Sequence, residues 1–255
     1  MTFWQLPSKL TKDFVDRFAL KGQQPVILKK TVIMAKQSET KKKKITKDEI
    51  IDAYMDYVLE HEKHPRSVYK FAKMNKMQEA DFYQFFGNFE GLRNEIWSKF
   101  YENTMNLMDN NEEVGQYNSR EKMLTFFYTF FEMLTANRSY VLFTLEEQED
   151  MMKNLPQLKG LRQNIKSFAK ELIEMDNDEK NYSFLRNSER VFSEGAWIQF
   201  LFLLKFWRDD QSAGFEKTDM AIEKSVNTIF DVFDNTPIEK VVDLGKFLYK
   251  EQMKA

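Results

Sequence analysis

The chain has 255 residues, of which 42% are hydrophobic and 31% charged, with a formal net charge of −2. This composition is typical of a globular protein, and the length allows one or two domains. The absence of cysteine excludes disulfides, thiolate metal sites and cysteine nucleophiles. With His61 and His64 as the only histidines, a histidine-based metal or acid–base centre has almost no residues to use.

The low content of Gly and Pro, 8 and 5 residues, predicts an all-α fold of long helices joined by short loops. No apolar run approaches the roughly 18 residues of a membrane span. Charged residues interrupt every apolar stretch of the first thirty residues, where a secretory signal would lie. We therefore expect a cytoplasmic protein with no membrane span.

Residues 1–45 are predicted to form a flexible N-terminal extension. The segment that starts at Met34 is polar and ends in four consecutive lysines, Lys41 to Lys44. Met34 is a plausible native start, in which case residues 1–33 would be an extension of the gene model. Both starts stay open from the sequence.

Helix signals become regular after residue 45. Thr46 and Glu49 have the spacing of a capping box, and apolar residues follow at helical intervals. The other predicted helices cover about 68–74, 78–86, 89–108, 119–134, 138–153, 158–175, 184–209, 217–234 and 237–255. We expect a helix-turn-helix head over residues 46–100 and a multi-helix body over residues 101–255.

The most specific motif runs from Phe71 to Leu92. Two short helices with a connection of three to four residues are typical of a helix-turn-helix unit. Without a gap, this stretch resembles the DNA-binding signature of the tetracycline-repressor (TetR) family. The matching positions are Ala72, Ala80, Phe82, Tyr83, Phe86, Asn88, Glu90 and Leu92. The resemblance extends over about residues 46–100.

The resemblance implies a one-component transcriptional regulator, which we interpret as a repressor. Such a protein binds operator DNA as a homodimer and responds to a small apolar or lipid-like ligand held in its body. By position in the motif, Ser67 and Tyr83 would contact phosphates, and Gln78, Glu79, Asp81 and Gln84 would face base edges. Lysines 41–44, which include Lys43 and Lys44, and Lys47 could reach a minor groove or the phosphate backbone. Lys76 is also expected among the DNA-binding residues.

Several DNA-facing positions depart from the family pattern. Lys76 stands where the family usually has Gly, which adopts a positive φ without strain. Glu79 and Asp81 place negative charges near DNA, although acidic residues in a first helical turn are also favoured by the helix dipole. Phe89 replaces a lysine that would contact phosphate. The alternative is therefore a TetR-fold protein that does not read DNA and instead binds a lipid, an isoprenoid or a partner enzyme.

The body is rich in aromatic residues, which fit either a packed core or an apolar ligand pocket. The predicted pocket residues are Phe126, Phe130, Met133, Trp197 and Leu201. By resemblance, the last two long helices would form the dimer interface, with Gly195, Ile222, Val226, Ile229 and Phe230. No P-loop, GxGxxG motif or nucleophile elbow is found. We therefore expect no enzyme activity, no catalytic residue, no metal site and no cofactor.

Overall fold

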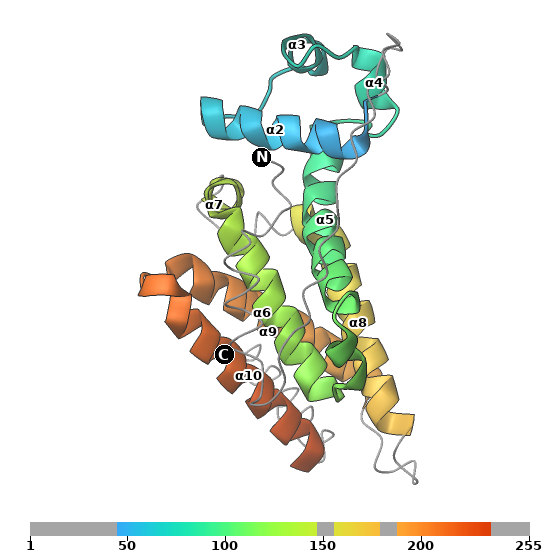
Figure 1. Cartoon of the computed structure of the whole chain (residues 1–255), viewed down its shortest axis with the longest axis vertical. Coiled ribbons are helices and arrows are strands. Elements are labelled where there is room, and N and C mark those ends of the chain that lie inside the picture. The colour runs from blue at the N-terminus through green and yellow to red at the C-terminus, as the bar shows by residue number, and fades with distance from the viewer. Residues whose placement is uncertain (1–44, 147–155, 179–187, 236–255) are drawn as a thin grey trace, which may run out of the picture. The chain divides into compact units, whose positions relative to one another are not determined.

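A computed structural model of the chain describes residues 45–146, 156–178 and 188–235, which contain helices and no strand (Figure 1). The predicted all-α fold is therefore confirmed. The described residues form two compact units, divided between Phe89 and Glu90. The predicted extension over residues 1–45, with the question of Met34, falls almost wholly outside the described residues, as does the predicted helix at 237–255.

The first unit contains α2 (Lys47–His61), α3 (Val68–Met74) and α4 (Glu79–Tyr83). The capping box predicted before α2 is confirmed. The backbone N–H of Thr46 donates to Glu49 Oε2 at 2.9 Å, and the N–H of Glu49 donates to Thr46 Oγ1 at 3.2 Å. Two backbone donors at the start of α2 are thus satisfied by local side chains.

Aromatic side chains hold the first unit together. The rings of Phe71 and Phe82 are fully buried, and their centroids lie 6.2 Å apart. Phe89 packs against both, with centroid distances of 5.5 Å to Phe71 and 5.2 Å to Phe82, and it stacks on Tyr54 at 5.6 Å. The residue that replaces the family's lysine therefore serves the core of this unit.

The α4 helix is shorter than predicted. The sequence pattern predicts a helix over about 78–86, but α4 ends at Tyr83. The chain then tightens into a turn in which the N–H groups of both Phe85 and Phe86 approach the carbonyl of Phe82 at 3.0 Å. Phe86 remains buried at the end of this turn, so the apolar spacing is kept although the helix is not.

Lys76, in the turn between α3 and α4, adopts a φ of 56°. The positive φ expected at this family glycine position is therefore present with a lysine in its place. An L-residue in the left-handed region costs roughly 1–2 kcal/mol relative to the right-handed one. The turn is stabilised by the N–H of Met77, which donates to the carbonyl of Ala72 at 3.0 Å.

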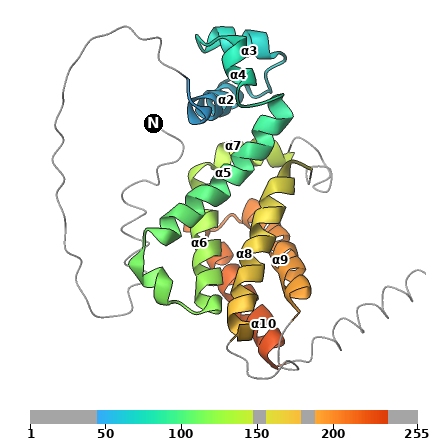
Figure 2. The ribbon, with the colours of Figure 1, turned by 90° about the vertical axis from the view of Figure 1, so that its right-hand side faces the viewer.

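The second unit is built from longer helices. In chain order they are α5 (Phe89–Asp109), α6 (Ser119–Ala136), α7 (Arg138–Glu146), α8 (Lys159–Asp178), α9 (Glu189–Asp209) and α10 (Glu216–Asn235). Two short 3₁₀ turns, η1 (Glu112–Gln116) and η4 (Ala213–Phe215), precede α6 and α10. The α8 helix packs along α9, and α6 contacts both α8 and α10 (Figure 2).

Asn118, rather than the predicted Ser119, caps α6. The Asn118 side chain accepts from the N–H of Glu121 at 2.9 Å, and Glu121 Oε2 accepts from the N–H of Asn118 at 2.9 Å. The Ser119 hydroxyl instead reaches α8, where it lies 3.0 Å from the carbonyl of Leu172 and 2.5 Å from Asp176 Oδ1. The Ser119 side chain, which the sequence pattern predicts to cap α6, is therefore used in a contact with a helix distant in sequence.

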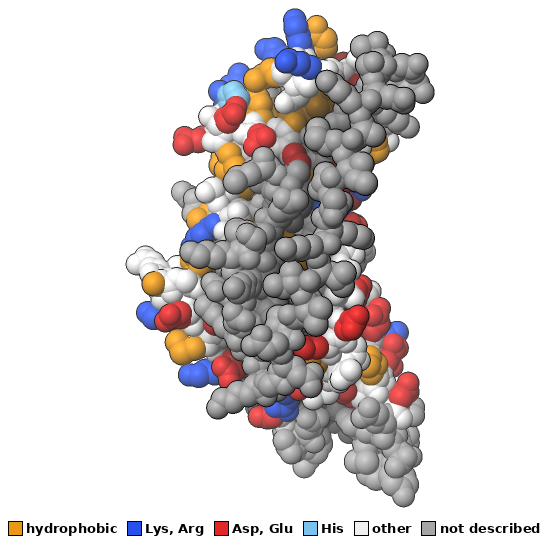
Figure 3. Space-filling view, viewed as in Figure 1, with side chains coloured by type: hydrophobic (Ala, Val, Ile, Leu, Met, Phe, Trp, Pro, Cys, Tyr) orange, Lys and Arg blue, Asp and Glu red, His pale blue; other side chains and the backbone are white. Residues whose placement is uncertain are grey.

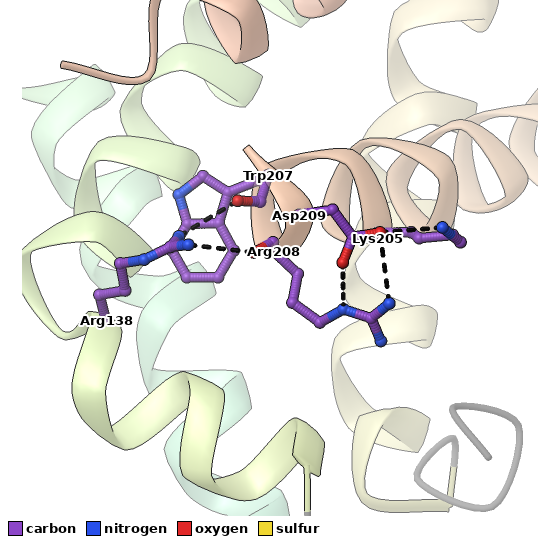
Figure 4. A network of polar contacts seen from close by, with 5 residues as sticks. All are labelled: Arg138, Lys205, Trp207, Arg208 and Asp209. Carbon is purple, nitrogen blue, oxygen red and sulfur yellow. Dashed lines mark hydrogen bonds and ion pairs between the residues drawn. The ribbon is translucent and has the colours of Figure 1, made fainter. Parts of the chain in front are cut away.

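Arg138 contacts the end of α9 and the turn that leads to α10 (Figure 4). Arg138, the first residue of α7, donates to the carbonyls of Trp207 at 3.1 Å and Arg208 at 3.0 Å. Its guanidinium also lies 4.4 Å from the ring centroid of Trp207 and 4.6 Å from that of Phe215. A cation here satisfies terminal carbonyls of α9 and complements the negative end of its dipole.

Asp210 joins the end of α9 to the start of α10. One carboxylate oxygen accepts from the N–H and hydroxyl of Ser212, at 2.8 and 2.7 Å. The other accepts from the N–H and hydroxyl of Thr218, at 2.9 and 2.7 Å. Burial favours a higher pKa for Asp210, but these four hydrogen bonds to the charged form outweigh it and hold the pKa at about 2.

We predict that Asp210→Asn lowers the free energy of unfolding at pH 7 by about 1–2 kcal/mol, because an amide cannot accept on both sides. Since the folded pKa lies below the ordinary value, the stabilisation is complete above about pH 4 and is lost as the pH falls towards 2. Thermal denaturation at pH 7 and pH 3 measures both effects. The difference in the free energy of unfolding between the wild type and Asp210→Asn should be smaller at pH 3 than at pH 7.

Asp209 provides the matched control. Hydrogen bonds from Arg208 and Lys205 also lower its pKa to about 2, but its side chain is half exposed. Solvent screens such pairs, so Asp209→Asn should change stability by less than about 1 kcal/mol. An equal loss in both variants would contradict the role given to the buried carboxylate.

At Lys76 we predict that Lys76→Val destabilises the first unit by about 1 kcal/mol, because a β-branched residue fits the left-handed region poorly. Lys76→Gly should leave stability unchanged or raise it, because the relief of strain offsets the greater freedom of unfolded glycine. Hydrogen exchange at the amides of α3 and α4 measures the difference. Equal protection in the two variants would rule out the positive φ.

Candidate functional site

Charge is segregated along the first unit. The stretch of residues 47–62, which contains α2, has one lysine and six acidic residues: Asp48, Glu49, Asp52, Asp56, Glu60 and Glu62. Residues 63–78 have five basic residues and no acidic one: Lys63, Arg66, Lys70, Lys73 and Lys76. Blue side chains gather over α3 and red ones over α2 in Figure 3. A net charge of −2 for residues 45–89 thus conceals a basic surface.

The five residues from Lys63 to Lys76 form what we call the basic surface. All five side chains are exposed, on α3 and on the segments that flank it. Within the described part of the chain, none of them forms an ion pair or a side-chain hydrogen bond. Each charge is therefore available to an external anion, and the absence of acidic residues from positions 63–78 favours a positive local potential.

The exposed residues of α4 and its flanks include three of the predicted DNA contacts. Gln78, Tyr83 and Gln84 are exposed, and Tyr83 keeps 52% of its surface accessible. Ser67 is half-buried, and its hydroxyl accepts from the N–H of Lys70 at 3.3 Å as the cap of α3. Lys47 is half-buried, whereas Lys43 and Lys44 lie outside the described residues.

The two acidic residues of α4 have partners within the unit. Asp81 Oδ2 accepts from the N–H of Gln78 at 2.9 Å, so this carboxylate caps the helix. Glu79 Oε1 accepts from the Tyr83 hydroxyl at 3.4 Å. Both side chains are half-buried rather than fully presented to solvent. The interpretation of Glu79 and Asp81 as first-turn stabilisers therefore has direct support for Asp81.

The Tyr83 hydroxyl is a proton donor at neutral pH. Loss of hydration and then the nearby charge of Glu79 raise the pKa of this hydroxyl above its usual value. A neutral phenol can donate to a phosphate oxygen, whereas a phenolate would repel it. The hydroxyl could exchange its long bond to Glu79 for one to an external anion.

The predicted pocket residues lie in the core of the second unit. Phe126, Phe130, Met133 and Trp197 are buried, and Leu201 is half-buried. Phe130 meets Phe200 edge-on at 5.5 Å, and Trp197 stacks on the same ring at 5.3 Å. Phe126 also packs against Phe130 at 5.7 Å, so three of the five residues belong to one packed aromatic cluster.

A groove lies instead on the outer side of α9 and α10. Its volume is about 700 Å³. The α9 helix contributes Gly195, Ile198, Phe202 and Phe206, and α10 contributes Lys217, Met220, Lys224 and Ile229. Ile198 and Phe202 are 65% and 52% exposed, so large apolar side chains face solvent here. A contiguous apolar surface of this kind marks a binding or association site.

The predicted dimer residues divide between this groove and the core. Gly195 and Ile229 line the groove. Ile222, Val226 and Phe230 are buried within the protomer, where Phe230 packs against Phe192 at 5.4 Å. Because these three side chains are used inside the protomer, a partner would meet the neighbouring face of α10.

Apart from Lys76, sequence reasoning missed the residues of the basic surface, and it also missed the exposed apolar residues Ile198 and Phe202. The lack of acidic residues between Lys63 and Lys76 is visible in the sequence, but it is hidden when charges are summed over the whole head. Ile198 and Phe202 are four residues apart on α9, and this spacing marks an apolar face. The spacing alone does not show which apolar face of α9 is covered by α8 and α10 and which face stays exposed.

Membrane-spanning helices and metal-binding clusters are both absent from the described residues. None of their helices has the length and apolar character needed to cross a bilayer. Among the same residues, no cluster of three or more acidic or histidine side chains is suited to holding a metal ion.

Comparison with known proteins identifies one family. The sequence pattern of the family described as "Tetracyclin repressor-like, C-terminal domain" matches residues 122–248, about half of the chain. No curated protein and no solved structure matches the chain significantly. The match covers the α6–α10 region, whereas the resemblance noted in the sequence lies in the helix-turn-helix segment. The two segments do not overlap and lead to the same conclusion: this chain belongs to the tetracycline-repressor (TetR) family.

Proposed function

We propose that this protein is a one-component transcriptional repressor that binds operator DNA as a homodimer. The observation that carries the proposal is the basic surface of Lys63, Arg66, Lys70, Lys73 and Lys76. It is exposed, its side chains have no partner among the residues that the structure describes, and it lies on a helix-turn-helix unit. Contacts to phosphates supply much of the affinity for DNA, and five exposed cations within residues 63–78 suit that task.

The departures from the family motif have structural explanations. Phe89 packs in the aromatic core of the first unit, and Asp81 caps α4. Glu79 accepts from the hydroxyl of Tyr83. These residues motivated the alternative of a TetR-fold protein that binds a lipid, an isoprenoid or a partner enzyme and does not read DNA. Because each has an internal role, the observations favour DNA binding over that alternative.

The exposed residues of α3 and of α4 with its flanks would have different roles in DNA binding. The lysines of α3 would contact the phosphate backbone and set the register of the unit on the duplex. Gln84 and Gln78 would read base edges, since an amide can bond to adenine with both of its polar atoms. The Tyr83 hydroxyl would donate to a phosphate. Affinity would then depend mainly on α3, and sequence preference on α4.

Dimerisation would use the apolar outer face of α9 and α10. Ile198, Phe202 and Met220 are exposed there, and they surround a groove that a second copy can fill. A two-fold dimer places the same face of both protomers in contact, so a self-complementary apolar surface is suited to it. Two linked heads would bind two half-sites of an operator.

We predict that Tyr83→Ala combined with Gln84→Ala reduces operator affinity at least about tenfold, because one phosphate contact and one base contact are lost. Selection of bound genomic fragments at moderate salt first supplies the operator. Electrophoretic mobility shift then gives the affinity. Both side chains are exposed, so circular dichroism should show an intact fold.

The operator fragment obtained by this selection also tests the role of the basic surface. Lys70→Gln with Lys73→Gln removes four phosphate contacts from the dimer, so the slope of log affinity against log salt concentration should fall by about 4, close to 0.9 for each contact. Lys205→Gln removes an exposed lysine of α9 and should leave the slope unchanged. The proposal fails if the wild type selects no fragment, or if the Tyr83 and Gln84 variant retains full affinity.

For the dimer, we predict that Phe202→Glu raises the dissociation constant by about 100-fold, since an unpaired charge would be buried between protomers. Sedimentation velocity across a concentration series measures the constant. Met175→Glu is the control, because Met175 is an equally exposed apolar residue of α8 that does not line the groove. A dimer that tolerates Phe202→Glu would show that association uses another face.

A further inference from the structure

The surface of α4 presents polar and apolar side chains but no cation. Residues 77–92, which contain α4 and its flanks, include neither lysine nor arginine. The exposed residues from 78 to 85 are Gln78, Ala80, Tyr83, Gln84 and Phe85. The basic surface therefore ends at Lys76, and the groups that follow it are amides, a methyl group and aromatic rings.

Three of these exposed residues share one face of α4. Ala80, Tyr83 and Gln84 are separated by three and four residues, so they are neighbours on the helix surface. Phe82 lies on the opposite side of α4 and is fully buried in the aromatic core of the first unit. The face that carries Gln84 is therefore the one that α4 turns towards solvent.

Each base pair has its own pattern of polar and apolar groups in the major groove. Guanine is read mainly by arginine or lysine, adenine by asparagine or glutamine, and the thymine methyl group by apolar side chains such as alanine and phenylalanine. The exposed residues of α4 and its flanks include the second and third kinds of side chain and lack the first. This chemistry suits A·T pairs and not G·C pairs.

We propose that α4 reads A·T pairs in the major groove, so that the part of each half-site that it contacts consists of A·T pairs. This preference rests on the operator binding proposed above. The amides of Gln78 and Gln84 would bond to adenine. Ala80 and Phe85 would contact thymine methyl groups.

The carboxylates of α4 do not favour cytosine. A carboxylate that faces the major groove can accept from the cytosine amine. Asp81 Oδ2 instead accepts from the N–H of Gln78 at 2.9 Å, and Glu79 Oε1 accepts from the Tyr83 hydroxyl at 3.4 Å. Both acidic side chains are half-buried. Among the exposed residues from 78 to 85, none therefore has a group suited to either base of a G·C pair.

Phe85 is presented by the turn that ends α4. Its N–H donates to the carbonyl of Phe82 at 3.0 Å, which holds the backbone of the turn. Phe82 and Phe86 are buried, whereas Phe85 keeps 37% of its surface accessible. A thymine methyl group placed against this ring would remove apolar surface from water on both partners.

The test begins with selection of bound duplexes from a random-sequence pool by the full chain at moderate salt. We expect A·T pairs at the enriched positions of each half-site. These pairs are then replaced by inosine·cytosine, which has the minor-groove groups of A·T and the major-groove groups of G·C. Affinity measured by mobility shift should fall about fivefold or more for each adenine that a glutamine reads. Unchanged affinity would overturn the proposal, because the minor groove would then be the source of the preference.

Uracil in place of thymine tests the methyl contact, since it removes only the methyl group. The wild type should bind the uracil duplex about threefold more weakly at the position that Phe85 contacts. Phe85→Ala should bind the thymine and uracil duplexes equally at that position. Both duplexes are compared with the same variant, so any change in its stability cancels. An equal loss in the wild type and the variant would overturn the assignment of Phe85.

A change of preference tests the amides. Gln84→Arg should convert one A·T pair of each half-site to G·C in the selected sequence, because arginine bonds to both O6 and N7 of guanine. Lys76→Gly is the control, since it removes the cation nearest to α4 and no side chain of α4. It should weaken binding to all duplexes by the same factor. An unchanged preference in Gln84→Arg, or an altered one in Lys76→Gly, would overturn the reading by Gln84.

The selection also separates this preference from the operator binding on which it rests. If the chain binds no duplex even at low salt, the proposed repressor function fails and the preference fails with it. If the chain selects one sequence with G·C pairs at the enriched positions, operator binding stands and the preference for A·T is overturned.

Discussion

Burial of the aromatic side chains of α6 is the constraint on which the second unit depends. Phe126 packs against Phe168 of α8 with ring centroids 4.9 Å apart, and Phe130 packs against Phe200 of α9 at 5.5 Å. Removing a phenylalanine side chain from water contributes about 1.5–3 kcal/mol. Because α6 is apolar on several sides, its surface is removed from water only when the surrounding helices pack around it.

Polar contacts then fix the position of α10 along α6. Arg120 donates to Asp231 of α10 at 2.7 Å, near one end of the pair of helices. Farther along, the Tyr128 hydroxyl reaches the carbonyl of Asp219 at 3.4 Å. These contacts fix the register of α10 on α6, whereas the phenylalanine rings supply most of the energy. The outer face of α9 and α10 is what remains once α6 is covered.

Features decided by near neighbours in sequence could be predicted. The capping box of Thr46 and Glu49 involves three residues of separation, and it is present as expected. The positive φ at Lys76 follows from the geometry of the turn that the motif requires. In each case the interacting groups are close along the chain, so that the pattern alone contains the necessary information.

Features decided by distant residues could not be predicted. Ser119 contacts α8 more than fifty residues away, and this contact moves the cap to Asn118. Ile222 and Ile229 are both apolar residues of α10, but only Ile222 is fully buried. The spacing of apolar residues marks possible faces, and the packing of other helices decides which face is covered. For the same reason, the sequence left open whether Phe126 and Phe130 lie in a core or line a pocket, and the packing of α8 and α9 buries both fully.

The segregated charge of the first unit gives it an electric dipole, with α3 positive and α2 negative. Charges are screened beyond about 8–10 Å at physiological ionic strength, so a distant polyanion experiences little force from either face. At closer range, the field would exert a torque that turns α3 towards the polyanion and α2 away from it. The chain can therefore keep a slightly negative net charge, which limits nonspecific adhesion to nucleic acids, and still present one face in a productive orientation at encounter.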